Sequence, residues 1–254
     1  MSAKLLTTAR DLQRRKARER QQLFVCEGIR ATEELLRSPL EIRGVIMAPA
    51  LATAPRGAAL RGAIEARGIP LLEVTERDFE SAATTESPQG ILAIAEIPDT
   101  SLDRLSLPAR ARLLVLDGVQ DPGNAGSMLR TAAALGASAT LAAPGTVDLW
   151  NAKVVRSAMG ALFHYPALPV SWDALDSLLA SNGIPLWGAD AAGQPVETIA
   201  PPTSVALAVG NEGAGLSAEA RARCERLVGI SIEPRIESLN VSVAAGILLH
   251  HFRE

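Results

Sequence analysis

Short apolar segments alternate with amphipathic segments along almost the whole chain. In the first hundred residues, runs rich in apolar and β-branched residues are separated by stretches whose apolar positions recur every three to four residues. The first pattern predicts strands and the second predicts helices. We expect strands at 23–28, 42–47, 71–74 and 90–96, and helices at 3–21, 29–37 and 56–67.

A second series of the same kind begins after residue 109. It opens with the buried strand 112–116, a polar loop and a helix at 124–135, which is the unit that presents ligands in α/β sheets. The predicted fold class is therefore α/β throughout. Further strands are expected at 140–143, 167–170, 184–189, 204–209 and 227–232, and further helices at 149–159, 172–180 and 239–252.

The two series are separated by a segment without sustained periodicity that contains two prolines, residues 97–109. We place a linker at 98–109, a smaller N-terminal domain at 1–97 and a second domain at 110–254. A chain of 254 residues with 48% apolar composition is long enough to give both domains a core of their own.

Composition indicates the cellular compartment of the protein and the kinds of site it can hold. Cys26 and Cys224 lie far apart, with no second thiol or histidine at zinc-ligand spacing, so neither a disulfide framework nor a cysteine-rich metal site is indicated. Residues 1–16 contain no apolar signal region, and no segment resembles a membrane span. We expect a cytoplasmic protein that needs neither a metal nor a membrane.

Charge is distributed unevenly along the chain. The net charge is −3, yet the first twenty residues hold seven Lys or Arg residues and only two acidic ones. A basic terminal helix binds phosphates in some proteins and is merely a solvated face in others, and both interpretations stay open. If this helix binds RNA, we expect the contacts to come from Arg14, Arg15 and Arg18.

Several common catalytic motifs are missing from the sequence. None of the lysines at 4, 16 and 153 follows a glycine, which excludes a Walker A phosphate-binding loop. The nucleophile elbow of α/β-hydrolases and the His-Glu-x-x-His zinc motif are also absent. Because the loops after strands 112–116 and 204–209 lack G-x-G-x-x-G spacing, a dinucleotide-dependent enzyme is disfavoured.

Three polar loops follow buried strands of the second domain, at the strand ends where ligands bind in open α/β sheets. The first, residues 116–137, has Asn124 where a helix begins and Arg130 more than one turn later. In the second, residues 209–217, Glu212 lies between two glycines that let backbone approach a ligand closely. The third, residues 230–252, carries further polar residues at the start of an Ala-rich helix.

A structural interpretation of these residues remains possible at this point. Asn124, Ser238 and Asn240 are all suitable helix N-caps, and Arg130 is also suitable as an ordinary surface cation.

In order and content, the three loops closely resemble the three motifs of the SpoU (TrmH) family of RNA ribose 2'-O-methyltransferases, which belongs to the SPOUT superfamily. The resemblance covers residues 112–252, with Asn…Arg, Gly-Asn-Glu-Gly and Ser-Leu-Asn-Val-Ser cores. Supporting stretches at 18–36, 85–94 and 153–163 resemble the family's ribosomal-protein-like RNA-binding domain and its linking helix.

The family resemblance implies a specific domain architecture and cofactor. It implies a C-terminal domain with a trefoil knot that binds S-adenosylmethionine, and a homodimer formed through that domain. Gly210, Ile230 and Leu239 would line the cofactor site, with Ser238 and Asn240 beside it.

The catalytic constellation implied by the resemblance is Arg130, Asn124 and Glu212, with Glu212 keeping the guanidinium in place. Arg130 is expected to be essential, and whether it is itself the base stays open, because a guanidinium normally remains protonated. The family usually has Ile-Pro-Met where this chain has Ile230-Ser231-Ile232.

The implied activity is 2'-O-methylation of a ribose in structured RNA. Ribosomal RNA is favoured over tRNA, because members of the family with the extra N-terminal domain are often rRNA enzymes. A noncatalytic RNA-binding or assembly protein with the same fold is the alternative, and retention of all three catalytic residues argues against it.

Overall fold

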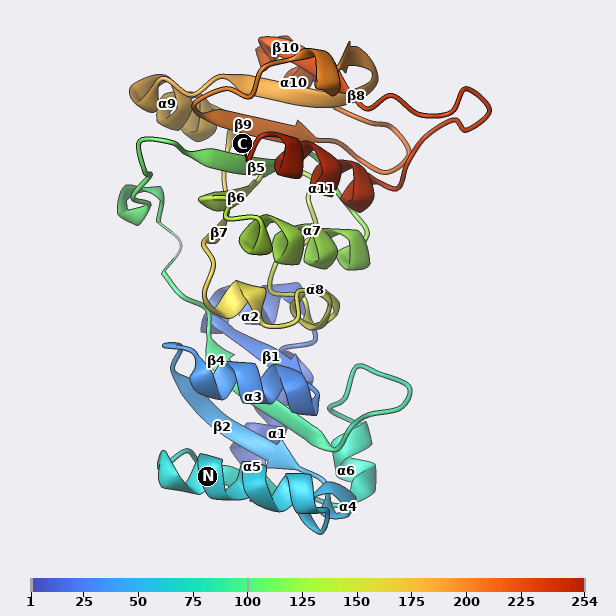
Figure 1. Ribbon diagram of the computed structural model, residues 1–254. Coiled ribbons are helices and arrows are strands. Elements are labelled where there is room, and N and C mark those ends of the chain that lie inside the picture. Colours follow the sequence, from blue (N-terminus) through green and yellow to red (C-terminus); the bar gives the residue numbers. More distant parts are fainter. Residues whose placement is uncertain (1, 100, 254) are drawn as a thin grey trace. The chain divides into compact units, whose positions relative to one another are not determined.

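The computed structural model describes residues 2–99 and 101–253, which divide into two units (Figure 1). The first unit contains residues 2–99 and the segment Trp150–His164, and the second contains residues 101–149 and 165–253. The elements of the first unit are α1 (Ser2–Asp11), α2 (Arg15–Gln21), β1 (Leu23–Glu27), α3 (Ile29–Arg37), β2 (Ile42–Met47), α4 (Pro49–Ala52), α5 (Pro55–Ala66), β3 (Leu71–Glu73), α6 (Glu76–Glu80), β4 (Ile91–Glu96), α8 (Ala152–Ser157) and the 3-10 helix η2 (Ala161–Phe163).

The first unit is built on a mixed four-stranded sheet in the order β1-β4-β2-β3. Strand β4 runs antiparallel to both of its neighbours, and β2 runs parallel to β3. The side chains of Ala9, Ile46 and Phe79 belong to a buried cluster that joins α1 and α6 to the sheet. These buried contacts explain why the apolar positions of α1 recur with helical spacing.

The segment Trp150–His164 packs within the first unit, whereas the sequence pattern assigned it to the second domain. Its aromatic side chains surround Phe24 of β1, with ring centroids 4.5 Å from Trp150 and 5.8 Å from Phe163. An apolar pattern predicts that a face is buried but does not say against which surface. The expected domain at 110–254 is therefore interrupted by a segment that packs elsewhere.

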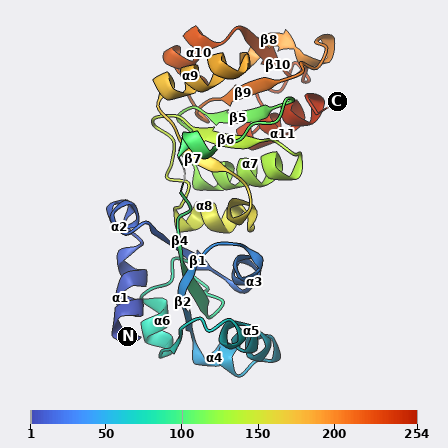
Figure 2. The same cartoon turned by 90° about the vertical axis from the view of Figure 1, so that its left-hand side faces the viewer.

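The second unit is built on a six-stranded, entirely parallel sheet in the order β10-β8-β9-β5-β6-β7. Helices α7 and α11 lie on one face of this sheet, and α9 and α10 lie on the other (Figure 2). This arrangement confirms the predicted α/β class. The elements are the 3-10 helix η1 (Leu102–Arg104), β5 (Arg112–Leu116), α7 (Pro122–Ala134), β6 (Ala139–Ala142), β7 (Ala167–Pro169), α9 (Trp172–Asn182), β8 (Leu186–Pro195), the 3-10 helix η3 (Val196–Thr198), β9 (Val205–Val209), α10 (Ala218–Arg223), β10 (Arg226–Gly229) and α11 (Val241–His251).

Strand order reverses between β9 and β5, which lie side by side in the middle of the sheet. In open α/β sheets, ligands bind outside the carboxyl ends of the strands near such a reversal. The loops 117–121 and 210–217 leave the sheet at this edge. Topology therefore brings the first two polar loops of the sequence together.

Several element boundaries differ from those expected. The helix expected at 3–21 is divided into α1 and α2, and the strand expected at 227–232 ends at Gly229. The last helix begins at Val241, because the Asn240 side chain caps it by accepting a hydrogen bond from the amide of Ser242 at 2.9 Å.

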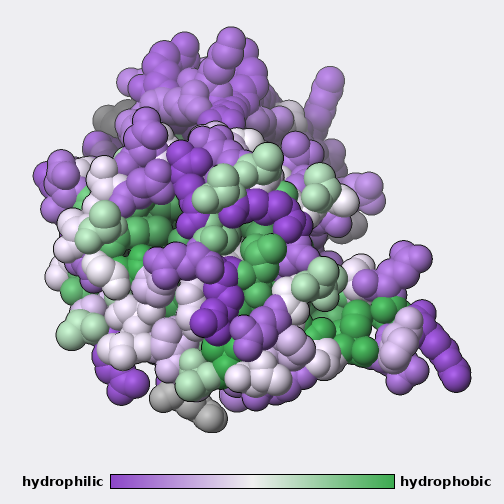
Figure 3. Space-filling view, turned by 90° about the horizontal axis from the view of Figure 1, so that it is seen from above, coloured by the Kyte–Doolittle hydropathy of each residue, from purple (hydrophilic) through white to green (hydrophobic). Residues whose placement is uncertain are grey.

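One face of the protein, seen from above the view of Figure 1, is largely hydrophilic, with hydrophobic side chains gathered toward its centre (Figure 3). Within residues 2–99 and 101–253, no helix is both long and apolar enough to cross a bilayer.

Candidate active site

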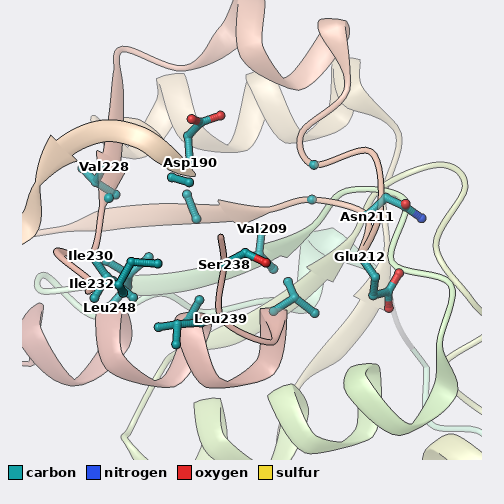
Figure 4. A pocket seen from close by; sticks show the side chains of 17 residues that line it. Asp190, Val209, Asn211, Glu212, Val228, Ile230, Ile232, Ser238, Leu239 and Leu248 are labelled. Atoms are coloured by element: carbon teal, nitrogen blue, oxygen red, sulfur yellow. The ribbon is translucent and has the colours of Figure 1, made fainter. Parts of the chain in front are cut away.

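A pocket lies at the carboxyl ends of β9 and β10, beside residues 189–191 of β8, and α11 borders it on one side (Figure 4). Its apolar walls include Val209, Val228, Ile232 and Leu248. Four residues that the sequence placed at a cofactor site, Gly210, Ile230, Ser238 and Leu239, also line this one pocket. Residues separated by almost thirty positions in the chain are thus brought to one place by the parallel sheet.

The loop after β9 approaches itself so closely that only glycine fits at position 210. A Cβ atom at Gly210 would lie 2.1 Å from the carbonyl carbon of Gly215. The Asn211 side chain orders the same loop, because its Oδ1 accepts hydrogen bonds from the amides of Gly213 at 2.9 Å and Ala214 at 3.0 Å. The backbone that borders the pocket is therefore rigid.

Asn211 also ties this loop to the first polar loop. Its Nδ2 donates a hydrogen bond to the carbonyl oxygen of Gly118 at 3.0 Å. The buried carboxylate of Asp117 adds a second tie by accepting a hydrogen bond from the amide of Ser217 at 2.6 Å. The sequence reasoning missed both residues, and the signal available was their position directly after the buried strands β5 and β9.

A carboxylate and two amides connect all three polar loops at the rim of the pocket. Glu212 accepts hydrogen bonds from the amides of Gln120 at 3.2 Å and Asp121 at 3.0 Å, and from Nδ2 of Asn124 at 3.1 Å. Oδ1 of Asn124 in turn accepts a hydrogen bond from Nδ2 of Asn240 at 3.1 Å. The orientation of the Asn124 amide is thus determined by a partner on each side.

These hydrogen bonds favour the ionised form of Glu212. Burial by itself would raise the pKa of Glu212, but hydrogen bonds from backbone amides, including those of Gln120 and Asp121, and from the Asn124 side chain outweigh burial and lower it. The carboxylate therefore carries a negative charge at neutral pH.

The structure decides between the two interpretations of Asn124. Asp121 is the N-cap of α7, since its Oδ1 accepts the hydrogen bond from the Asn124 amide at 2.8 Å. The Asn124 side chain is therefore not used as a cap and instead faces Glu212 and Asn240. For Asn240 the two interpretations coexist, because its Oδ1 caps α11 while its Nδ2 binds Asn124.

Arg130 does not join this cluster, which corrects the expectation that Glu212 holds its guanidinium. Arg130 follows Asn124 by six positions on α7, which corresponds to about 9 Å along the axis and about 120° around it. The side chain of Arg130 is exposed on α7, and it makes no hydrogen bond or ion pair with the rest of the described chain. Its guanidinium is free to bind a ligand.

A charged residue that the sequence reasoning did not single out, Asp190, also lines the pocket, from the middle of β8. Its carboxylate pairs with Arg221 and accepts a hydrogen bond from the amide of Ala192 at 2.8 Å. No group of three or more His, Cys, Asp or Glu side chains within the described chain is placed to hold a metal ion.

The three arginines expected to bind RNA differ in how far their side chains are exposed. Arg18 is only 3% exposed, and its guanidinium donates hydrogen bonds to the carbonyl oxygens of Leu12 at 2.6 Å and Gln13 at 3.0 Å. This corrects the expectation for Arg18, which stabilises the turn between α1 and α2. Arg14 and Arg15 are exposed and form ion pairs with acidic residues of the same segment.

The fold and the pocket together define an α/β enzyme domain with an apolar ligand site at the carboxyl ends of its parallel strands. The chain belongs to the SpoU rRNA methylase family, whose model matches residues 111–250. A second model, the MRM3-like substrate binding domain, matches residues 6–93. The family resemblance seen in the sequence is confirmed.

Similar proteins extend over most of the chain. It is 35% identical over 244 residues to the 23S rRNA (guanosine(2553)-2'-O)-methyltransferase RlmP of Bacillus subtilis, a match that covers 95% of this chain and 93% of that protein. It is 36% identical over 193 residues to the 23S rRNA (guanosine-2'-O-)-methyltransferase RlmB of Ralstonia nicotianae, which covers 74% of this chain and 78% of that protein.

Among solved structures, the AdoMet-bound rRNA methyltransferase from Sinorhizobium meliloti is similar with a TM-score of 0.85 and 28% sequence identity. This match covers 98% of this chain and 94% of that one.

Proposed function

We propose that this protein transfers the methyl group of S-adenosylmethionine to a ribose 2'-hydroxyl of RNA, and that the RNA is ribosomal. The observation that carries the proposal is the apolar pocket with the connected side chains of Glu212, Asn124 and Asn240 at its rim. The relatives support it, since RlmP and RlmB are by name 23S rRNA 2'-O-methyltransferases. Their names favour ribosomal RNA over tRNA.

The residues of the pocket fit an adenosyl group. Apolar side chains such as Ile230, Leu239 and Leu248 offer flat contact to a base, and the backbone is bare at Gly210 and Gly229. A Cβ atom at Gly229 would lie 2.8 Å from the carbonyl oxygen of Asp190, so side chains are excluded where the strands and loops converge. When bound, S-adenosylmethionine supplies the electrophilic methyl group.

Asn124 is the residue that we assign to orienting the ribose. One of its Nδ2 hydrogens is bound to Glu212 and one Oδ1 lone pair is bound to Asn240, which leaves one hydrogen and one lone pair for a hydroxyl group. Because both partners are fixed, little reorganisation is needed when the substrate binds.

Arg130 has a different role in this proposal. A guanidinium stays protonated and pairs with phosphate through two parallel hydrogen bonds. The exposed position of Arg130, without a partner in the described chain, suits this interaction. We assign Arg130 to holding an RNA phosphate beside the pocket, rather than to proton abstraction.

A trefoil knot in the second unit is part of the proposal. Strand β10 is at the edge of the sheet, yet the helix that follows it, α11, packs against α7 and β9 in the middle. The chain between them, residues 230–240, must therefore return across the carboxyl ends of the central strands. Its last residue, Asn240, ends beside Asn124, in the first polar loop.

We also propose a homodimer formed through α11. Val243 and Ile247, four residues apart on one face of this helix, are 50% and 41% exposed. Together with Thr131 and Gly246 they line an open groove. Two large apolar side chains exposed side by side on a helix are typical of an interface. Val243→Glu should give a monomer in sedimentation.

RNA binding by the first unit is supported by its match to a substrate binding domain. With Arg18 buried, we propose that the phosphate contacts come from the exposed cations of α2. Lys16 and Arg20 lie four residues apart, on one face of the helix, and neither pairs with another described side chain.

We place the protein in the cytoplasm, where ribosomal RNA and free thiols such as Cys26 are both found.

A direct assay tests the proposed reaction. Full-length protein is incubated with methyl-labelled S-adenosylmethionine and total RNA from a strain that lacks the gene, and 2'-O-methylated nucleotides are then mapped. We expect one new modified ribose in ribosomal RNA. Binding of that RNA without any methyl transfer would instead identify a noncatalytic RNA-binding protein.

A further inference from the structure

The chain that follows β10 runs along the wall of the pocket, and its side chains alternate between the pocket and the outside. Ile230 and Ile232 both line the pocket, whereas Ser231 between them is exposed and absent from its wall. In an extended chain, successive side chains point to opposite sides. Ser231 therefore faces away from the pocket while its two neighbours form part of it (Figure 4 labels both isoleucines).

The Ser231 hydroxyl has a specific partner on that outer side. It donates a hydrogen bond to Oε1 of Glu197, which belongs to the 3-10 helix η3. This hydrogen bond is the largest cause that lowers the pKa of Glu197, and the nearby His251 lowers it further. Glu197 is thus ionised at neutral pH and accepts the hydrogen bond in its charged form, which is the stronger kind.

The helix η3 is firmly held in the second unit, so it can serve as an anchor. Val196 and Ile199 on either side of Glu197 are buried. The Thr198 hydroxyl donates a hydrogen bond to the carbonyl oxygen of Pro195 at 2.7 Å. Nε2 of His251 contacts the carbonyl oxygen of Ile199 at 3.1 Å, which ties η3 to the end of α11.

The chain beyond Ile230 has left the sheet and has no backbone ladder to hold it. Strand β10 ends at Gly229, and the residues from 233 to 238 are exposed. The turn from Glu233 to Ile236, with a hydrogen bond of 2.9 Å from the Ile236 amide, is local to this loop. The hydrogen bond between Ser231 and Glu197 therefore links the segment that carries Ile230 and Ile232 to η3.

We propose that Glu197 is a positioning residue for the cofactor: through Ser231 it holds Ile230 and Ile232 in place as one wall of the pocket. This inference rests on the proposed binding of S-adenosylmethionine in that pocket. Glu197 itself does not line the pocket, so its effect on the cofactor is indirect and passes through Ser231. A proline at position 231 would fix the backbone angle φ, and serine does not. The hydrogen bond from Ser231 to Glu197 restrains this part of the chain instead.

The test uses full-length protein and calorimetry with S-adenosylmethionine and with its demethylated product. We expect Glu197→Ala and Ser231→Ala each to weaken binding by roughly three- to tenfold, which is the range for one hydrogen bond to a charged group at an exposed site. Glu197→Gln keeps an acceptor oxygen and should lose less. Both residues act through one hydrogen bond. The double variant should therefore bind the cofactor about as tightly as the single variant with the lower affinity.

A matched control is Glu225→Ala, which removes another exposed carboxylate of the same unit that makes no side-chain hydrogen bond or ion pair with the described chain. Its affinity should equal that of the wild type. At saturating cofactor, the kcat of Glu197→Ala should be unchanged while KM for the cofactor rises. Wild-type affinity in Glu197→Ala and Ser231→Ala, or losses that add in the double variant, would overturn the inference.

Hydrogen exchange without cofactor separates this inference from the proposed function. Amides in residues 230–240 should exchange faster in Glu197→Ala than in wild type, whether or not the pocket binds S-adenosylmethionine. Absence of cofactor binding by the wild type would contradict the proposed function. Unchanged exchange in the variant would contradict the anchor.

Discussion

Glu212→Gln perturbs the connected side chains at the rim of the pocket with the smallest change in shape. Oε1 of Glu212 accepts hydrogen bonds from the amide of Asp121 and from Nδ2 of Asn124, and Oε2 accepts one from the amide of Gln120. All three partners are donors. In either orientation, the NH₂ group of a glutamine therefore points at a donor, and at least one hydrogen bond is lost.

The loss of stability should be small because residue 212 is largely exposed. One hydrogen bond to a charged group at such a site contributes about 0.5–1.5 kcal/mol. The effect on catalysis should be larger, since Asn124 loses the partner that orients its amide. A displacement of a positioning group by about 1 Å costs about 100-fold in rate, so we expect kcat to fall by roughly 30- to 100-fold.

The assay is transfer of a labelled methyl group to RNA under saturating conditions, with cofactor affinity measured separately by calorimetry. Affinity should change by less than about threefold, because the orienting contacts serve the RNA and not the adenosyl group. Glu225→Gln is the matched control, as an exposed glutamate without a side-chain partner in the described chain. A kcat for Glu212→Gln within threefold of the control would refute the assigned role of this carboxylate.

The same substitution has a pH signature. The pKa of Glu212 is lowered in the folded protein, so its hydrogen bonds stabilise the fold fully above the ordinary pKa of 4.5. This contribution is lost as pH falls from 4.5 through the lower folded value. Thermal unfolding is measured between pH 7 and pH 3.5. The fall in Tm over this range should be larger for the wild type than for Glu212→Gln, which lacks the titrating carboxylate.

Four further variants test other parts of the structure. Arg130→Ala should lower turnover by roughly 100-fold or more with an unchanged Kd for cofactor, since a phosphate contact is lost and alanine suits a helix; near-normal turnover would place the active site elsewhere. Lys16→Gln with Arg20→Gln should make the slope of log affinity for RNA against log salt shallower by about 1.4–1.8, whereas an unchanged slope would move RNA recognition away from α2. Arg18→Gln should instead destabilise the first unit by about 2–4 kcal/mol, seen as a lower Tm, because two carbonyl oxygens lose a charged donor. Gly210→Ala should cost about 3 kcal/mol and abolish cofactor binding, because its methyl group would overlap backbone atoms; normal binding would show that the loop after β9 is not as tight as described.

Local sequence patterns determined most of the secondary structure of this protein. The strands of both sheets overlap the expected runs, because an apolar β-branched run must be buried wherever it occurs, although β8 continues to Pro195, beyond the end expected at residue 189. The three polar loops were recognisable because each directly follows a buried strand. Four of the expected cofactor residues line one pocket for the same reason.

The partners of individual side chains could not be obtained in this way. Arg18 has the same local environment in the sequence as Arg14 and Arg15, and only the tight turn at Leu12 buries it. Arg130 and Glu212 belong to adjacent motifs, yet helix geometry turns the arginine away from the carboxylate. In both cases, direction in space depends on packing and not on spacing along the chain.

The assignment of segments to the two units also depends on tertiary contacts as well as on local sequence. The sequence by itself predicted an α/β protein with a linker at 98–109 and ligand chemistry after the parallel strands. Only the tertiary structure decided that Trp150–His164 packs around Phe24 in the first unit, and that Asn124, Glu212 and Asn240 form one connected site. The physical reason is that periodicity specifies which face of an element is apolar, whereas long-range contacts between complementary surfaces select the partner that covers it.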